Sequence, residues 1–448
     1  KKNYFTVASK EERKAIFDYA EGYKTFLDNA KTEREACEVA VKMAKDAGFT
    51  EYKFGDKLGA GDKKYFVNRG KSVVVFRVGT KNLEEDGFRL IASHIDAPRV
   101  DIKQNPLYEE AGLCFLKTHY YGGIKKYQWT TIPLALHGVV VLKNGKKVEI
   151  KVGEDPADPV FYIDDLLPHL GAEQMAKGGA KIIEGEQLNV VVGSMPYDDE
   201  KVEKKIKLTV LNILNEKYGM CEEDFISAEL SAVPAYPARD IGFDRALIGA
   251  YGHDDRVCAY PALTAVLNNE SEHTVVAMLV DKEEIGSEGN TGMQSRIYSD
   301  LLEDICEAMG ASFRKTRYVS KCLSSDVTPA YDPNFASVYE RMNSAMLACG
   351  TCMNKFTGAR GKSGSNDANA EFVGEVRAMF ESDGVVWQTA ELGKVDAGGG
   401  GTVAKYLANL NIDTVDLGVP VISMHAPWEL ISKADLYSNY RAFIAFMK

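Results

Sequence analysis

The sequence predicts an α/β protein in which a three-layer main domain is interrupted by a β-rich inserted domain. Residues 274–280, Thr-Val-Val-Ala-Met-Leu-Val, form the short, unbroken apolar run that is typical of a strand covered on both faces. From about residue 245 onward, helix-like and strand-like runs alternate, as they do where helices cover a sheet. Between residues 106 and 240 the pattern changes to strand-like runs separated by turns, which indicates a separate unit.

The individual elements follow in chain order. Residues 10–47 place apolar side chains among charged ones at helical spacing, and residues 53–105 are expected to form strands. In the middle region, the strand-like runs 131–142 and 147–152 flank the turn signal Asn144-Gly145. The candidate metal ligands described below lie on both sides of this region and none within it, so the chain leaves the main domain and returns to it. The expected units are residues 1–105 and 241–448 for the main domain, and residues 106–240 for the insert.

Composition favours a large folded protein of the cytoplasm. The chain has 448 residues, more than one simple core usually holds, and 45% of them are hydrophobic. The formal net charge is -11 and the basic residues are scattered among more numerous acids, which disfavours nucleic-acid binding. We expect no membrane partner, because no apolar stretch approaches the roughly 18 residues of a membrane span and no secretory hydrophobic region follows the first residues.

The eight cysteines are spread along the chain without a dense pattern, which suits reduced thiols in the cytoplasm. Cys349 and Cys352 lie three residues apart. Without a second pair or a redox context, we interpret them as two thiols on a helix rather than as a metal or redox motif.

Two adjacent carboxylates, Glu283 and Glu284, carry the strongest functional signal. They follow the buried strand predicted over residues 274–280, and the carboxyl ends of such strands are where open α/β sheets build their sites. Because neighbours on an extended chain point in opposite directions, one carboxylate can bind a metal while the other takes a proton from an activated water. An isolated Asp-Lys-Glu-Glu run is ordinarily a solvated turn, so this interpretation depends on the rest of the chain.

Two further segments supply partners for such a site. His94 and Asp96 follow an apolar stretch and would share one face of a strand, so Asp96 could hold the His94 ring nitrogen that is not on the metal. Asp254 and Asp255 lead into a helix-like stretch, where a carboxylate could bridge two ions. The alternative interpretations are a buried core histidine for His94 and a helix N-cap for Asp254.

Two later segments add a carboxylate and an imidazole. Asp326 follows a strand-and-turn pattern, and His425 follows the apolar run 417–424. Each alone could be a turn former or a buried core residue. Taken together, two histidines and three or four carboxylates near the ends of expected strands are donors suited to a pair of zinc-like ions.

The order of these motifs, His-x-Asp, Asp-Asp, Glu-Glu, Asp and a late Met-His, resembles that of the aspartyl aminopeptidase family, metallopeptidase family 18. The similarity spans most of the chain, with anchor segments from Ser93 to Pro427. The motifs Ser-His-Ile-Asp-Ala-Pro, Glu-Glu-Ile-Gly-Ser and Met-His-Ala are specific in combination. The resemblance implies a three-layer zinc-peptidase catalytic domain and an inserted dimerisation domain, with dimers assembling into a tetrahedral dodecamer. It also implies two divalent ions, zinc first and cobalt or manganese as alternatives. Their ligands would be Asp254 as the bridge, His94 and Asp326 for one ion, and Glu284 and His425 for the other.

The resemblance assigns further roles. Glu283 resembles the general base, and Asp96 falls where the family keeps the partner of its first histidine. His169, in Asp-Leu-Leu-Pro-His-Leu, resembles a family histidine that reaches a neighbouring subunit's active site and helps to polarise the scissile carbonyl; an ordinary loop histidine is the alternative. Lys362 and Lys394 lie in segments that resemble the family's substrate pocket, where either could pair with an acidic first residue, although surface lysines need no function.

Two glycine-rich segments are candidates for anion binding. Residues 398–401 precede a helical pattern over 403–410, so backbone N–H groups, that of Gly400 among them, could lie at a helix start near an anion; a flexible connector is the alternative. Residues 358–363 end like a phosphate-binding loop, but the required first glycine would fall at Phe356, so the spacing fails.

The sequence departs from the family pattern in two places. The usual Asp-Asn reads Asp254-Asp255, and Asp254 is chosen as the bridge because it aligns the following Ala262-Leu263 with the family. The usual Met-His-Ser reads Met-His-Ala-Pro-Trp, so the details of the substrate pocket are not carried over.

We therefore expect a metallo-aminopeptidase that removes an acidic or neutral N-terminal residue from peptide substrates. Glu283 would take a proton from a water activated by two metals and return it to the leaving amine. A carboxypeptidase or N-deacylase with a related catalytic domain is one alternative. A noncatalytic scaffold is another, although a scaffold has little reason to keep the base and every ligand.

Overall fold

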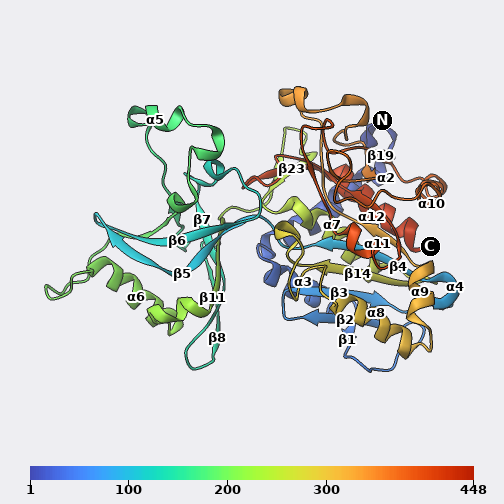
Figure 1. The fold of residues 1–448 in the computed structure, drawn as a ribbon, viewed down its shortest axis with the longest axis horizontal. Helices are drawn as coiled ribbons and strands as arrows, with labels where there is room; N and C mark the ends of the chain where they lie inside the picture. Colours follow the sequence, from blue (N-terminus) through green and yellow to red (C-terminus); the bar gives the residue numbers. More distant parts are fainter. The chain divides into compact units, whose positions relative to one another are not determined.

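The computed structural model describes residues 1–448, and the chain divides into two compact units (Figure 1). The larger unit contains residues Lys1–Ala97, Ala238–Met424 and Glu429–Lys448, and the smaller contains Pro98–Pro237 with the short segment His425–Trp428. The predicted boundary between residues 105 and 106 falls inside one strand, β5 (Arg99–Glu110), which belongs to the smaller unit. The sequence has no turn signal where the chain passes from one unit to the other, so the strand-like pattern alone could not locate the boundary.

A nine-stranded sheet forms the centre of the larger unit. Its four middle strands, β14, β4, β15 and β21, are parallel to one another, while β3 and β17 flank them antiparallel. The order across the sheet is β1 (Thr50–Glu51), β2 (Lys63–Asn68), β3 (Ser72–Arg77), β14 (Thr274–Val280), β4 (Phe88–His94), β15 (Lys321–Ser324), β21 (Asp413–Gly418), β17 (Thr351–Asn354) and β19 (Trp387–Thr389).

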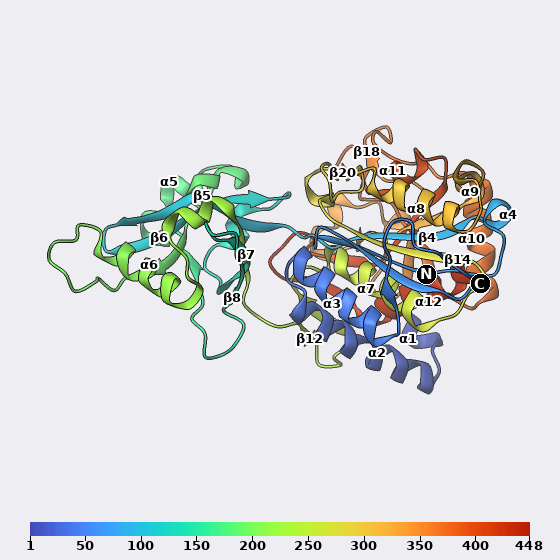
Figure 2. The same cartoon turned by 90° about the horizontal axis from the view of Figure 1, so that it is seen from below.

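Helices cover both faces of this sheet, which confirms the predicted three-layer α/β fold. In β14, Val275, Ala277 and Leu279 pack into the core on one face and the alternate residues pack into the core on the other. Figure 2 shows the two helical layers on opposite sides of the sheet. The first includes α2 (Lys10–Asn29), α3 (Glu33–Asp46), α7 (His253–Asn268), α10 (Ala370–Ser382) and α12 (Lys433–Met447), and the second includes α8 (Ile297–Ala308), α9 (Phe313–Val319) and α11 (Ala404–Ala408).

The predicted helical region 10–47 forms two helices because a capping box interrupts it. The Thr32 hydroxyl accepts the N–H of Glu35, and the Glu35 carboxylate accepts the N–H of Thr32. This reciprocal pair satisfies N–H groups at the start of α3 that the helix itself cannot. Two four-residue helices, α1 (Tyr4–Val7) and α4 (Leu83–Asp86), complete the N-terminal part.

Smaller sheets complete the larger unit. One contains β12 (Arg239–Ile241), β13 (Leu247–Ala250), β23 (Glu429–Ser432), β22 (Pro420–Ile422) and β16 (Thr328–Pro329). Another pairs β18 (Gly358–Ala359) with β20 (Gly399–Gly400), so Gly400 lies in a strand and not at a helix start; α11 begins only at Ala404. The expected helix around Cys349 and Cys352 is also wrong, because Cys352 lies within β17.

The smaller unit is built on a seven-stranded sheet whose neighbouring strands are antiparallel. The turn at Asn144-Gly145 joins β7 to β8, and a helix, α6 (Lys205–Tyr218), packs against the sheet. The order is β8 (Lys147–Val152), β7 (Leu134–Val141), β11 (Ala228–Pro234), β5, β6 (Leu113–Tyr121), β10 (Val190–Gly193) and β9 (Tyr162–Ile163). The short α5 (Ala172–Met175) lies in the connection between β9 and β10.

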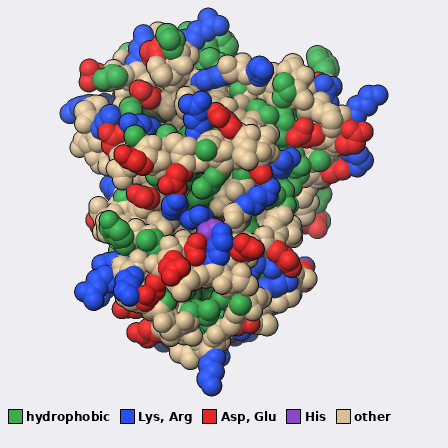
Figure 3. Space-filling model, turned by 90° about the vertical axis from the view of Figure 1, so that its right-hand side faces the viewer, with side chains coloured by type: hydrophobic (Ala, Val, Ile, Leu, Met, Phe, Trp, Pro, Cys, Tyr) green, Lys and Arg blue, Asp and Glu red, His purple; other side chains and the backbone are tan.

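The surface carries both signs of charge in close mixture. On the face shown in Figure 3, basic side chains lie among acidic ones. Exposed pairs such as Lys42–Asp46 at 2.8 Å and Arg377–Glu381 at 2.8 Å show the same interspersion along single helices. None of the helices has both the length and the apolar character needed to cross a membrane.

Candidate metal centre

The ends of three neighbouring parallel strands bring the candidate ligands of the larger unit together. His94 is the last residue of β4, and Asp326 lies two residues beyond the end of β15. Glu283 and Glu284 follow β14 in a short 3₁₀ turn, Glu283–Ile285. Because Val280 pairs with His94 in register, the carboxyl ends of β14 and β4 are level, so these side chains gather at one edge of the sheet.

A further candidate ligand, Asp254, comes from the first turn of α7. Oδ1 of Asp254 lies 3.1 Å from Nε2 of His94, and the backbone N–H of Asp254 donates to Glu429 at 3.0 Å. Asp255 is fully buried and instead accepts the backbone N–H of His94 at 3.3 Å. The geometry thus distinguishes two residues between which the sequence left an ambiguity, and it directs Asp254 toward the histidine ring.

Three carboxylates surround the His94 ring nitrogen. Besides the contact with Asp254, Nε2 lies 3.7 Å from Oδ1 of Asp326 and 3.8 Å from Oε2 of Glu283. Ligand atoms of His94, Asp254 and Asp326 all lie within 4.8 Å of one another, and the same holds for His94, Glu283 and Glu284. This combination of imidazole and carboxylate donors is one that zinc and similar divalent ions accept.

The electrostatics of the group call for a cation. Burial alone would lower the pKa of His94, but the surrounding carboxylates of Asp254, Asp326 and Asp96 outweigh that effect and raise it well above the usual range. Burial and the neighbouring Asp326 carboxylate raise the pKa of Glu283. Several negative groups thus crowd one imidazole in a buried place, and a divalent ion would relieve their repulsion. The residues present therefore fit a metal site.

Asp96 holds the histidine and the glutamate turn in place at once. Its Oδ1 lies 3.1 Å from Nδ1 of His94, which directs Nε2 toward the carboxylates. The same carboxylate accepts the backbone N–H groups of Glu283 and Glu284, each at 3.2 Å. The predicted contact with His94 is present, and the second set of contacts makes Asp96 a positioning residue for two strand ends.

Three residues around the cluster carried no clear signal in the sequence. Glu429 supports Asp254 from 175 positions away in the chain. Asp416, in β21, is buried and accepts the Thr402 hydroxyl at 2.6 Å; an acid inside an apolar run was its only signal. Gly418 leaves room for the ligand loop, since a Cβ there would lie 1.6 Å from the carbonyl oxygen of Asp326.

Four further sequence-predicted residues have contacts or exposures of their own. His425 is part of the smaller unit, where its Nδ1 lies 2.6 Å from the carbonyl oxygen of Gly123; donation to that oxygen leaves the ring's lone pair on Nε2. His169 is exposed in the 3₁₀ turn Pro168–Leu170. Lys362 pairs with Asp367 at 2.9 Å, and Lys394 is exposed. The functional roles of these residues stay predictions.

Comparison with known proteins identifies the family. Residues 26–447 match the family model described as Aminopeptidase I zinc metalloprotease (M18). A relative from Clostridium acetobutylicum, a probable M18 family aminopeptidase 1, is 48% identical over 100% of this chain and 98% of its own. The chain belongs to the M18 family. It is therefore a metallo-aminopeptidase, a hydrolase of peptide bonds, as the sequence predicted.

Two solved structures share the fold over nearly the full chain or all of it. The crystal structure of an M18 aminopeptidase from Thermotoga maritima superposes with a TM-score of 0.95 at 43% identity, covering 100% of this chain and 99% of that one. An S. cerevisiae mApe1 dodecamer matches with a TM-score of 0.78 at 21% identity, covering 96% of each chain, and at that distance it supports the fold alone.

Proposed function

We propose that this M18 protein removes the N-terminal residue from peptides by means of two divalent ions bound at the candidate metal centre. The observation that carries the proposal is the convergence of His94, Asp254 and Asp326 within 4.8 Å at the carboxyl ends of parallel strands. When bound there, the ions would lower the pKa of a water molecule and polarise the scissile carbonyl. Zinc is the proposed metal because the family model describes a zinc metalloprotease; cobalt and manganese suit the same donors.

The ligands would divide into two sets, as the family resemblance implies. Asp254 would serve both ions, His94 and Asp326 would complete the first site, and Glu284 and His425 would complete the second. The first set is supported by the contacts of His94 with the two aspartates. For His425, the hydrogen bond to Gly123 supports the assignment, because it favours the neutral ring tautomer that a metal ligand needs.

Glu283 is proposed as the general base and general acid. Its carboxylate belongs to the cluster, and its backbone is held by Asp96, so its position is fixed by the same residue that orients His94. Glu283 takes a proton from the attacking water and returns it to the leaving amine. Positioned acid–base groups contribute about 10²–10⁴-fold to rate.

The substrate preference is proposed to be an acidic or neutral first residue. An acidic side chain would pair with Lys362 or Lys394, and the backbone of Gly400 would contact the substrate. Lys362 already pairs with Asp367, so a substrate carboxylate would have to compete with that ion pair. Lys394 has no such acidic partner in the structure and is the better candidate.

Self-association is proposed through the smaller unit, with dimers assembling into a dodecamer in the cytoplasm. His169 lies among side chains that a lone subunit exposes, including Leu167 at 48% and Leu170 at 70%. Such a patch is typical of an interface, and it supports the proposal that His169 acts in a neighbouring subunit's active site. The S. cerevisiae mApe1 dodecamer, which shares the fold, supports the proposal of a dodecamer.

Release of free amino acids from unblocked and N-acetylated peptides tests the function. The protein would be reconstituted with zinc, cobalt or manganese, and first residues would include Asp, Glu, Leu and Ala. Sequential release from the unblocked peptides alone is the expected result. Release from the carboxyl end would favour a carboxypeptidase, cleavage of the acetyl group would favour an N-deacylase, and no release at full metal occupancy would favour a scaffold.

A further inference from the structure

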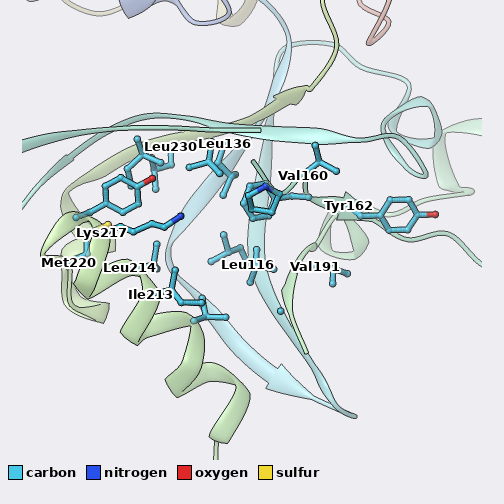
Figure 4. Close-up of a pocket in the computed structure, with 18 of the residues that line it drawn as sticks. Leu116, Leu136, Val160, Tyr162, Val191, Ile213, Leu214, Lys217, Met220 and Leu230 are labelled. Atoms are coloured by element: carbon cyan, nitrogen blue, oxygen red, sulfur yellow. The ribbon is translucent and has the colours of Figure 1, made fainter. Parts of the chain in front are cut away.

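The smaller unit contains an apolar cavity between α6 and its sheet (Figure 4). The cavity measures about 390 Å³. Leu116, Leu136 and Leu230 line it from the strands, and Ile213 and Leu214 line it from the helix. Its volume falls within the range of about 300–1,000 Å³ that small-molecule sites occupy.

The helix over this cavity is loosely packed. Of the residues of α6, only Ile206 is buried, and Ile213 is 44% exposed. An amphipathic helix ordinarily buries its apolar stripe against the core, but here part of that stripe faces the cavity. Engineered apolar cavities of about 150 Å³ stay dry and bind apolar molecules, so a larger space with the same kind of wall suits an apolar ligand.

One charged side chain lines the cavity. Lys217, in the last turn of α6, is the only charged residue in a wall that contains neither Asp nor Glu. Figure 4 shows its side chain extending from the helix toward the strands. Lys217 is exposed, and its ammonium group makes no ion pair or hydrogen bond in the structure. An apolar wall with one cation at its edge is complementary to a molecule with an alkyl chain and one anionic group.

We propose that this cavity binds an unbranched, medium-chain fatty acid. The alkyl chain would lie between α6 and the sheet, and the carboxylate would pair with the Lys217 ammonium group. The inference is independent of the peptidase chemistry, since every residue it uses lies in the smaller unit and none belongs to the metal centre.

Calorimetric titration of the full-length protein with octanoate, decanoate, dodecanoate and dodecan-1-ol tests the proposal, with each acid below its micelle concentration and the alcohol below its solubility limit. Affinity should rise about fourfold per methylene and level off once the cavity is filled. Dodecanoate should bind about two- to fivefold more tightly than dodecan-1-ol because of the ion pair. Lys217→Met should remove that preference and leave the affinity for the alcohol unchanged. Lys205→Met, on the same helix but outside the wall, is the matched control and should change neither affinity.

A second variant tests the position of the ligand. Leu214→Trp would fill the space and should abolish binding of both dodecanoate and the alcohol, with thermal unfolding used to confirm that the protein is folded; Ile213→Phe, at a more exposed point of the same wall, serves if that variant does not fold. The proposal is overturned if dodecanoate fails to bind the native protein, as it would if a second copy of the chain covered the cavity. It is equally overturned if Lys217→Met keeps the preference for the acid, or if folded cavity-filled variants still bind.

Discussion

In the larger unit, carboxylates of Asp254, Asp326 and Glu283 crowd around the His94 ring, whereas in the smaller unit the Lys217 ammonium group stands alone beside apolar side chains. Both regions are incomplete, but they lack different things. The first has buried negative charge that its own residues do not balance, and the second has apolar surface that its own residues do not cover. Carboxylates without enough positive charge around them indicate a metal ion. An unfilled apolar cavity beside a single ammonium group indicates an amphiphilic ligand.

The largest expected effect tests the chemistry of the charged region. Glu283→Gln replaces the proposed base with an amide that cannot accept the proton, while the ligands around His94 stay in place. We expect kcat to fall by about 10²–10⁴-fold with metal content unchanged. Peptide hydrolysis and elemental analysis of the purified protein measure the two quantities. Glu288→Gln, an exposed neighbour, is the control, and loss of metal from Glu283→Gln would instead place Glu283 among the ligands.

The ion pairs of Asp240 provide a contrast with the metal centre, because their positive and negative charges compensate each other. Asp240 pairs with buried Lys433 at 2.8 Å, with Lys24 at 2.9 Å and with Arg245 at 2.9 Å. Asp240→Asn leaves the buried Lys433 ammonium group without its closest counter-charge and should lower the free energy of unfolding by about 3 kcal/mol. Asp46→Asn, in an exposed pair with Lys42, should cost less than about 0.5 kcal/mol.

The pH dependence of that loss has a definite sign. Burial would raise the pKa of Asp240, but Lys433, Lys24 and Arg245 hold it well below its usual range. A carboxylate with a depressed pKa stabilises the folded state above its unfolded pKa of about 4, and this contribution is lost as the pH falls. Urea titrations should therefore show the gap between wild type and Asp240→Asn narrowing below about pH 4. A gap that stays constant to pH 3 would contradict the ion-pair explanation.

Replacement of Asp96 tests whether this residue positions the metal ligands or takes part in catalysis directly. Asp96→Asn keeps the shape of the side chain but places an NH₂ group where one oxygen accepted an N–H, either from His94 or from the Glu283-Glu284 turn. Metal affinity should fall about 10–100-fold, as it does when a partner of a ligating histidine is removed. Competition with a chelator measures it, and Asp300→Asn is an exposed control. If excess metal restores activity fully, Asp96 acts through the ligands; if metal affinity is unchanged, the positioning role is wrong.

The sequence predicted the framework of the charged region because its signals were local. The run over residues 274–280 forms β14, as predicted. A strand with both faces buried is apolar at nearly every position, so its pattern is easy to recognise. His94 and Asp96 are in contact, as their spacing suggested, although the strand ends at His94 and Asp96 reaches the ring from the following loop. The ligands gather at the carboxyl ends of buried strands, where the sequence predicted the site of an open α/β sheet.

The remaining features depend on turns and on distant contacts. Glu283 and Glu284 lie in a 3₁₀ turn and not on an extended chain, so the reason given for their opposite orientation does not apply. The support of Asp254 by Glu429 joins residues 175 positions apart, and no local pattern encodes it. Gly400 was expected at a helix start but lies in β20. A run of glycines has no side-chain pattern that distinguishes a strand from a helix start. The cavity under α6 was not predicted, since the middle region was expected to be β-rich and α6 itself was not predicted.

The smallest expected effect tests the packing of the cavity against that of the core. Leu214 of α6 faces the cavity and is half-buried, whereas Leu301 of α8 is fully buried in the core of the larger unit. Leu214→Ala should lower the free energy of unfolding by less than about 1 kcal/mol, because the side chain has few neighbouring atoms to lose. Leu301→Ala should cost about 2–5 kcal/mol. Urea titration that follows each unit separately measures both. Equal costs would mean that α6 packs tightly on its sheet in solution, and in that case the space for a fatty acid would not exist.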